Sequence, residues 1–176
     1  VNAVIDALFA EGIKEVVVND SHANMDNILI EEFDDRATLI SGSPKPYSMM
    51  EGIDPTYDAV FFVGYHGKPG TLESIMDHTY SSSTVFAARI NDKPLSEAGI
   101  NGRLAGYYGV PVAFLSGDQN AVQCAKEELN NPTGVIVKEA VGRTSARLFP
   151  FPEVVKKIDN GVKQAVDKID TLAPTT

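Results

Sequence analysis

The sequence is poor in residues that mark disulfide-rich or membrane-bound proteins. Cys124 is its only cysteine, and it has no tryptophan. A single cysteine can form no disulfide within the chain and lacks the paired spacing of a zinc–thiolate motif. We therefore expect Cys124 to be a small buried residue of a helix. The sequence also has no long apolar run and no signal-like segment, which predicts no membrane partner and favours a cytoplasmic location.

Positive charge is scarce as well. The chain has 15 lysines and arginines against 24 aspartates and glutamates, a formal net charge of −9 at pH 7. Binding to nucleic acid requires a concentrated basic face, so this balance argues against a nucleic-acid partner. The acidic residues are scattered along the chain without an acidic tail, which is typical of a solvated surface.

Several catalytic motifs are missing. The sequence has no Gly-x-Ser-x-Gly elbow, no glycine-rich phosphate loop ending in Lys-Ser or Lys-Thr, and no His-Glu-x-x-His helix. These patterns mark α/β serine hydrolases, nucleotide hydrolases and helical zinc proteases respectively. None of these three classes is supported.

Apolar patterning predicts alternating strands and helices. Short β-branched runs without alternation suit a parallel sheet covered on both faces, and spacings of three and four residues suit amphipathic helices. We expect helices at 1–10, 24–33, 97–108, 118–129 and 152–172, a helical turn at 71–76, and strands at 15–18, 38–40, 59–63, 84–90, 110–115 and 134–137. Ser96 and Asp118 are predicted N-caps. This order predicts a single α/β domain over 1–176, a three-layer sandwich with a mainly parallel sheet flanked by helices.

The three histidines each stand near the end of a predicted strand or in a polar loop. His22 follows a valine-rich run, His66 follows Val60-Phe61-Phe62-Val63, and His78 precedes a threonine, a tyrosine and three serines. Sites in open α/β sheets gather beyond the carboxyl ends of the strands. Neutral imidazole is the commonest protein ligand of transition metals, so this placement indicates a metal-centred site.

Each of these residues also has an ordinary structural explanation. His22 alone is more often a loop histidine with one hydrogen bond, and glycine-flanked loops such as that of His66 also occur without chemistry. Glu97 is a candidate carboxylate ligand, but glutamates in a first helical turn also stabilise the helix dipole. His78 could move protons or orient a nucleophile near a metal, or could lie in a solvated serine-rich loop.

Five longer segments resemble the zinc-dependent D-aminopeptidases of the dipeptide-permease operon, the DppA-type enzymes. They are EVVVNDSH (15–22), LISGSPKPYSMMEG (39–52), FVGYH (62–66), INDKPLSEAGIN (90–101) and AGYYGVPVAFLSGD (105–118). These segments lie in the family's order and cover most of residues 1–145. Several long motifs in the correct order are far more specific than any one histidine.

The resemblance implies a role for each candidate residue. His22 and His66 match zinc ligands, Glu97 matches a carboxylate ligand, and His78 matches a catalytic histidine near the metals. Family members are two-zinc enzymes that release N-terminal D-amino acids, notably D-alanine, from short peptides by means of a zinc-activated water. They form homo-oligomers, ring-shaped decamers that enclose the active sites.

The chain also departs from the family pattern. The remaining metal ligands come from an Asp-x-Glu motif on a first strand, which has no equivalent here, and the C-terminal region is missing or replaced. We therefore expect a fragment of the family's catalytic domain. Gly67-Lys68-Pro69-Gly70, just after His66, differs from typical members, so substrate preference need not follow.

Three hypotheses remain open at this point. The first is a zinc-dependent D-aminopeptidase. The second, motivated by the absent Asp-x-Glu motif, is a non-catalytic α/β module that binds a metal or a peptide. The third is a different metal-dependent amidohydrolase acting on L-peptides or other amides.

Overall fold

A computed structural model describes all of residues 1–176. The helices are α1 (Asn2–Ala10), α2 (Glu97–Tyr107), α3 (Gln119–Glu128) and α4 (Phe151–Val166), with 3-10 turns η1 (Ser48–Met50) and η2 (Ile169–Thr171). The strands are β1 (Val17–Asn19), β2 (Thr38–Ile40), β3 (Val60–Tyr65), β4 (Ala88–Ile90), β5 (Lys93–Leu95), β6 (Val112–Gly117), β7 (Thr133–Ile136), β8 (Lys138–Gly142) and β9 (Ser145–Leu148).

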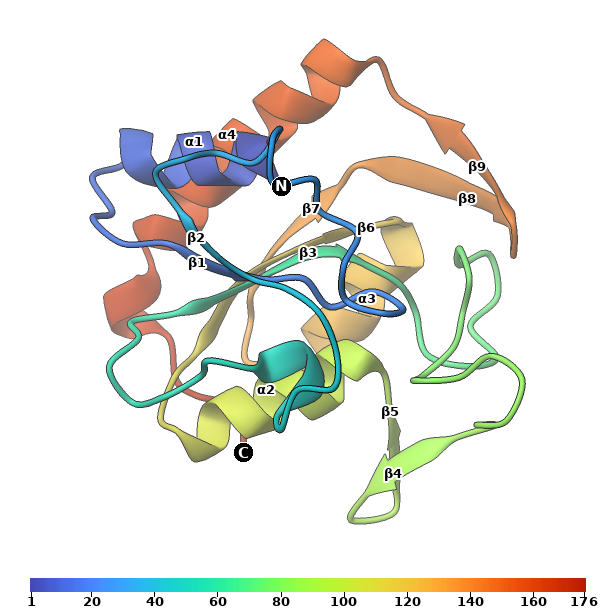
Figure 1. The fold of residues 1–176 in the computed structure, drawn as a ribbon. Helices are drawn as coiled ribbons and strands as arrows, with labels where there is room; N and C mark the ends of the chain where they lie inside the picture. The colour runs from blue at the N-terminus through green and yellow to red at the C-terminus, as the bar shows by residue number, and fades with distance from the viewer.

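The centre of the molecule is a parallel sheet in the order β3-β6-β7, and a second parallel pair, β1-β2, lies beside it. All six residues of β6 are buried, as expected for a short apolar strand with both faces covered. Helices α1 and α4 lie on one side of the sheet, and α2 and α3 on the other (Figure 1). The prediction of an α/β fold with a parallel sheet between helices is confirmed.

Two apolar clusters fill the spaces between these layers. Phe114 packs with Val162 of α4 in one cluster, and the next residue, Leu115, packs with Val122 of α3 in the other. Successive side chains of a strand point to opposite faces, so β6 supplies both halves of the core. The central strand therefore joins the two helical layers.

The two predicted helix caps are present. The Ser96 side chain accepts a hydrogen bond from the Gly99 amide at 3.1 Å. The Asp118 carboxylate accepts from the amides of Asn120 and Ala121 at 2.8 and 2.9 Å. Both caps satisfy amides that have no partner within a helix.

Two predicted helical segments are wrong. Residues 24–33 and 71–76 form turns instead. The Asp20 carboxylate accepts from the amides of Asn27 and Ile28, and Asp118 accepts from the amide of Ile75. These buried carboxylates bind amides that a helix would have used, and φ values of 62° at Met25 and 47° at Met76 are incompatible with a right-handed helix.

Other predicted boundaries also shift. The strand expected at 84–90 is reduced to β4, which forms an antiparallel hairpin with β5 across the two-residue loop Asn91-Asp92. Both loop residues have positive φ, 49° and 64°, the conformation of a tight hairpin turn. The last helix ends at Val166 instead of 172, and the strand predicted from 110 begins at Val112.

The β8-β9 hairpin was not predicted. Its strands run antiparallel and only Ala140 among their residues is buried, so they lack a buried apolar run that would mark them in the sequence. None of the helices combines the length and apolar composition needed to cross a membrane.

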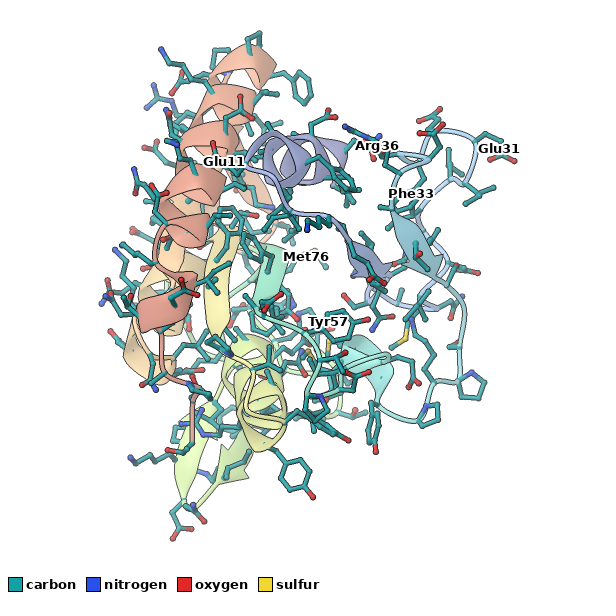
Figure 2. The ribbon with its side chains drawn as sticks, turned by 90° about the vertical axis from the view of Figure 1, so that its left-hand side faces the viewer. Glu11, Glu31, Phe33, Arg36, Tyr57 and Met76 are labelled. Atoms are coloured by element: carbon teal, nitrogen blue, oxygen red, sulfur yellow. The ribbon has the colours of Figure 1, made fainter.

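A cavity of about 640 Å³ separates the β1-β2 pair from the central sheet. β1 pairs only with β2 and β3 pairs only with β6, so the edges of β1 and β3 that face this cavity carry no neighbouring strand. Its lining is mostly apolar and includes Val4 of α1, Val17 of β1, Phe61 of β3 and Tyr57. Figure 2 shows Tyr57 between the body of the protein and the β1-β2 pair.

The loop before β2 also contacts α1. Arg36 forms ion pairs with Asp6 of α1 and with Asp34, and its guanidinium lies 4.7 Å from the centre of the Phe9 ring. Figure 2 shows Arg36 beside α1. These contacts join α1 to the loop before β2.

Truncation of a side chain of the central strand tests this description of the core. Phe114 is fully buried, so Phe114→Ala is expected to lower the free energy of unfolding by about 3–5 kcal/mol. Phe86 is 94% exposed, so the matched variant Phe86→Ala is expected to change it by no more than about 0.5 kcal/mol. Denaturant unfolding of both variants measures the difference, and equal losses would contradict the assigned core.

Candidate metal centre

Three side chains from three segments converge beyond the carboxyl end of β3. His66 directly follows β3, Glu97 opens α2, and His78 lies in the loop between them. Their ligand atoms all lie within 4.8 Å of one another. Nε2 of His66 is 3.3 Å from Oε2 of Glu97, and Nε2 of His78 is 3.7 Å from Oε1. The position beyond a strand end agrees with the sequence expectation for His66.

Backbone carbonyls orient both imidazoles. Nδ1 of His66 lies 3.2 Å from the Gly67 carbonyl, and Nδ1 of His78 contacts the Met76 carbonyl. When Nδ1–H donates to such a carbonyl, Nε2 is left with its lone pair, the arrangement typical of metal-binding histidines. The Nε2 atom of each histidine faces Glu97, so the three side chains direct their ligand atoms toward one another.

The donor set and its spacing fit zinc. Zinc takes histidine nitrogens and carboxylate oxygens at about 2.0–2.2 Å in tetrahedral geometry, which places neighbouring ligand atoms about 3.3–3.5 Å apart. The separations of 3.3 and 3.7 Å from Glu97 are close to this value. The two rings are stacked, with centroids 4.0 Å apart and an interplanar angle of 17°. His66, His78 and Glu97 could thus hold one ion with little movement.

The electrostatics of the cluster favour the charged pair when no metal is bound. Burial opposes protonation of His66, but the hydrogen bond and charge of Glu97 outweigh it, so the pKa of His66 is raised. Burial similarly opposes ionisation of Glu97, yet His66, the Tyr80 amide and His78 together lower the Glu97 pKa. A metal entering the cluster would therefore displace a proton from His66.

Glu97 is held toward the histidines by the loop that carries His78. Its Oε1 accepts a hydrogen bond from the Tyr80 amide at 2.8 Å, and Tyr80 adopts a left-handed conformation with φ of 61°. The carboxylate is only 10% exposed. A glutamate that merely stabilised the helix dipole would have no need of these contacts, so the geometry favours a role in the site.

His22 lies outside this cluster. It follows the end of β1 and borders the cavity between β1 and β3. The Asn27 side-chain amide stabilises the loop of His22 by donating hydrogen bonds to the His22 carbonyl at 2.5 Å and to the Asp20 carboxylate at 3.1 Å. Burial opposes ionisation of Asp20, but the hydrogen bonds from Asn27 and Ile28 outweigh it and lower the Asp20 pKa. The structure does not bring His22 together with His66 and Glu97, and its role as a ligand stays a prediction.

Asp118 has a second role that the sequence did not reveal. Besides capping α3, it accepts hydrogen bonds from the Ser74 hydroxyl at 3.1 Å and from the Ile75 amide at 2.8 Å. Ser74 in turn accepts from the Gly67 amide, and the His78 amide donates to the Gly67 carbonyl at 3.2 Å. One buried carboxylate thereby supports the loop from His66 to His78. The contacts of Asp118 with Ser74 and Ile75 join residues more than 40 positions apart, so no local pattern could predict them.

Comparisons with known proteins show similarity to one family of enzymes. The profile of a family described as D-aminopeptidase matches residues 1–176. A curated D-aminopeptidase of Bacillus subtilis (strain 168) is 36% identical over 178 residues, which cover 99% of this chain and 63% of that protein.

A solved structure shows the same fold. It is described as the Zn-dependent D-aminopeptidase DppA from Bacillus subtilis, a self-compartmentalizing protease, and it matches with a TM-score of 0.92 at 35% identity. The match covers 99% of this chain and 63% of that one. The chain thus spans less than two thirds of the length of the relatives it matches.

The coupling of His66 to Glu97 can be tested in the metal-free protein. Glu97→Gln removes the carboxylate but leaves His66 buried, so the His66 pKa is expected to fall below that of an exposed histidine. The wild type should instead titrate above that value, because the Glu97 carboxylate stabilises the protonated imidazole. NMR titration of the imidazole Cε1 protons measures both. Glu153→Gln, at the exposed start of α4, is the control, and an unmoved His66 pKa in Glu97→Gln would refute the coupling.

Proposed function

The chain belongs to the D-aminopeptidase family, and from this premise we propose that it provides the metal centre of a zinc-dependent aminopeptidase. The proposed reaction is removal of N-terminal D-amino acids, such as D-alanine, from short peptides. The observation that carries the proposal is the convergence of His66, His78 and Glu97, with both Nε2 atoms turned toward one buried carboxylate. An ion held by His66 and Glu97, with the His78 imidazole beside it, is the simplest purpose of such an arrangement.

In the proposed site, His66 and Glu97 hold zinc, and His22 contributes a further ligand from the β1 loop. The chemistry that zinc supplies when bound is polarisation of the peptide carbonyl and acidification of a water molecule. His78 accepts the proton of the attacking water and returns it to the departing amine. The Met76 carbonyl on Nδ1 keeps the Nε2 atom of His78 free for this exchange.

The cavity between β1 and β3 supports a second zinc as part of the proposal. Its apolar lining and the two facing strand edges suit one more parallel strand, and the carboxyl end of that strand would lie beside Asn19, Asp20 and His22. Carboxylates of an Asp-x-Glu motif placed there would lie on the His22 side of the site. We propose that they complete a two-zinc centre that joins His22 to the cluster.

We further propose that the complete protein assembles into a ring-shaped homo-oligomer, a decamer, that encloses its active sites. The description of the matched Bacillus subtilis structure as self-compartmentalizing supports this assembly. Enclosure would restrict the substrates to short peptides.

A non-catalytic module that binds metal or peptide is the second candidate. The favouring observation is that only three potential ligand groups converge, all on the side of β3 and α2. Three ligands hold a metal less tightly than a complete set. Such a module would bind zinc without hydrolysing peptides.

The ligand assignment predicts the effect of two histidine variants. His66→Ala removes a ligand whose Nε2 faces Glu97, so zinc affinity should fall by more than about 100-fold, since even the partners of ligands contribute 10–100-fold. His22→Ala removes the further ligand of the β1 loop, so it should lower zinc affinity less than His66→Ala and leave the ion held by the cluster in place. Elemental analysis and chelator competition measure stoichiometry and affinity. Wild-type zinc content in His66→Ala would refute the assignment.

Hydrolysis separates the candidate functions. We expect D-alanyl-D-alanine to be cleaved in the presence of zinc, and His78→Ala to lower turnover by about 100-fold or more while zinc content stays unchanged. Zinc binding without turnover would identify the non-catalytic module. Equal or faster cleavage of L-alanyl-L-alanine would identify a different amidohydrolase.

A further inference from the structure

Glu128 is a buried carboxylate outside the cluster, and the proposed chemistry does not use it. It is the last residue of α3, and its side chain is only 5% exposed. Oε2 accepts hydrogen bonds from the Ser96 amide at 2.9 Å and from the Ser96 hydroxyl at 2.7 Å. Oε1 accepts from the Lys68 ammonium at 3.1 Å. Both carboxylate oxygens are therefore hydrogen-bonded to segments that are far away in the sequence.

Both partners of Glu128 adjoin residues of the metal centre. Ser96 directly precedes Glu97 and caps α2, so its position sets where the helix and the Glu97 backbone begin. Lys68 follows His66 by two residues in the same loop. A single carboxylate thus fixes the segment of one proposed ligand relative to the segment of the other.

The surroundings of Glu128 are shaped for this contact. A Cβ atom at Gly99 would lie 2.2 Å from Oε2, so only glycine allows the carboxylate to reach the start of α2. The Lys68 ammonium, 3.1 Å from Oε1, places a positive charge beside the buried carboxylate. Glu128 also falls on the buried stripe of α3 with Ala121 and Ala125, where an unpaired charge would be costly.

We propose that Glu128 is a positioning residue of the metal centre, which ties Lys68 to Ser96 and thereby sets the separation of His66 and Glu97. This inference rests on the proposed function, in which these two side chains hold zinc. Metal sites require ligands fixed to within about 0.5 Å by supporting contacts, and loss of such contacts weakens metal binding. The rival explanation is that Glu128 only stabilises the fold.

Substitution of Glu128 tests the inference through metal binding. Glu128→Gln keeps the size of the side chain and an oxygen for Ser96 but loses the ion pair with Lys68. We expect zinc affinity, measured by chelator competition, to fall about 10–100-fold, and the visible absorption of bound Co²⁺ to change shape. The control is Glu127→Gln, whose carboxylate accepts a hydrogen bond from Gln123 on the exposed face of α3 and makes no ion pair with Lys68. That variant should bind both metals like the wild type.

A second variant covers the case in which Glu128→Gln does not fold. Lys68→Met removes the same ion pair from a side chain that is 29% exposed, and we expect a similar loss of zinc affinity. The double variant should bind zinc no more weakly than Glu128→Gln alone, because the two residues act through one contact.

The outcomes distinguish this inference from the proposed function. If Glu128→Gln and Lys68→Met lower the thermal unfolding temperature but keep wild-type zinc affinity and Co²⁺ absorption, Glu128 is only structural and the inference fails. If His66→Ala also binds zinc like the wild type, the proposed metal site itself is wrong. If zinc affinity falls in His66→Ala but is retained in Glu128→Gln and Lys68→Met, the positioning role is wrong and the proposed metal site stands.

Discussion

A carboxylate removed from water must be surrounded by hydrogen-bond donors or positive charge. This constraint shapes the whole end of the protein that carries the candidate metal centre. The buried carboxylates are Asp20, Glu97, Asp118 and Glu128. Each is satisfied by backbone amides or side chains from a different segment. The irregular loops that follow β1 and β3 are therefore fixed by these four groups more than by regular secondary structure.

This arrangement explains how polar chemistry is joined to an apolar fold. The central strand β6 and its two clusters provide a rigid base, and α2 and α3 begin or end at the site. Glu97 and Glu128 lie on neighbouring helix ends, and Asp118 begins α3. The loop that carries His66 and His78 has few regular contacts of its own, so the helix ends determine where both imidazoles lie.

The sequence predicted most of the regular structure. β3, β6, β7 and the four helices have continuous apolar runs or amphipathic spacing, and the Ser96 and Asp118 caps follow from local chemistry. The predictions for 24–33 and 71–76 failed because carboxylates outside these segments, Asp20 and Asp118, bind their amides, which helix propensity cannot register. The β8-β9 hairpin failed because exposed strands lack an apolar pattern.

The site was partly predictable for the same reasons. Strand-end position singled out His66, whereas the selection of Glu97 over other first-turn glutamates depended on the resemblance to a family. The carbonyls of Gly67 and Met76 set the histidine tautomers, and Glu128 binds its partners, only once the chain is folded. The sequence alone could not reveal these contacts. In the sequence, Glu128 has one visible signal, an acidic residue on the otherwise apolar stripe of α3.

The cavity between β1 and β3 also bears on self-association. Strand edges without a neighbour are common starting points for intermolecular pairing and aggregation. Here the two edges face inward, and side chains of α1 and of residues 49–57 also line the space between them. These side chains shield both edges from edge-to-edge pairing with a second molecule.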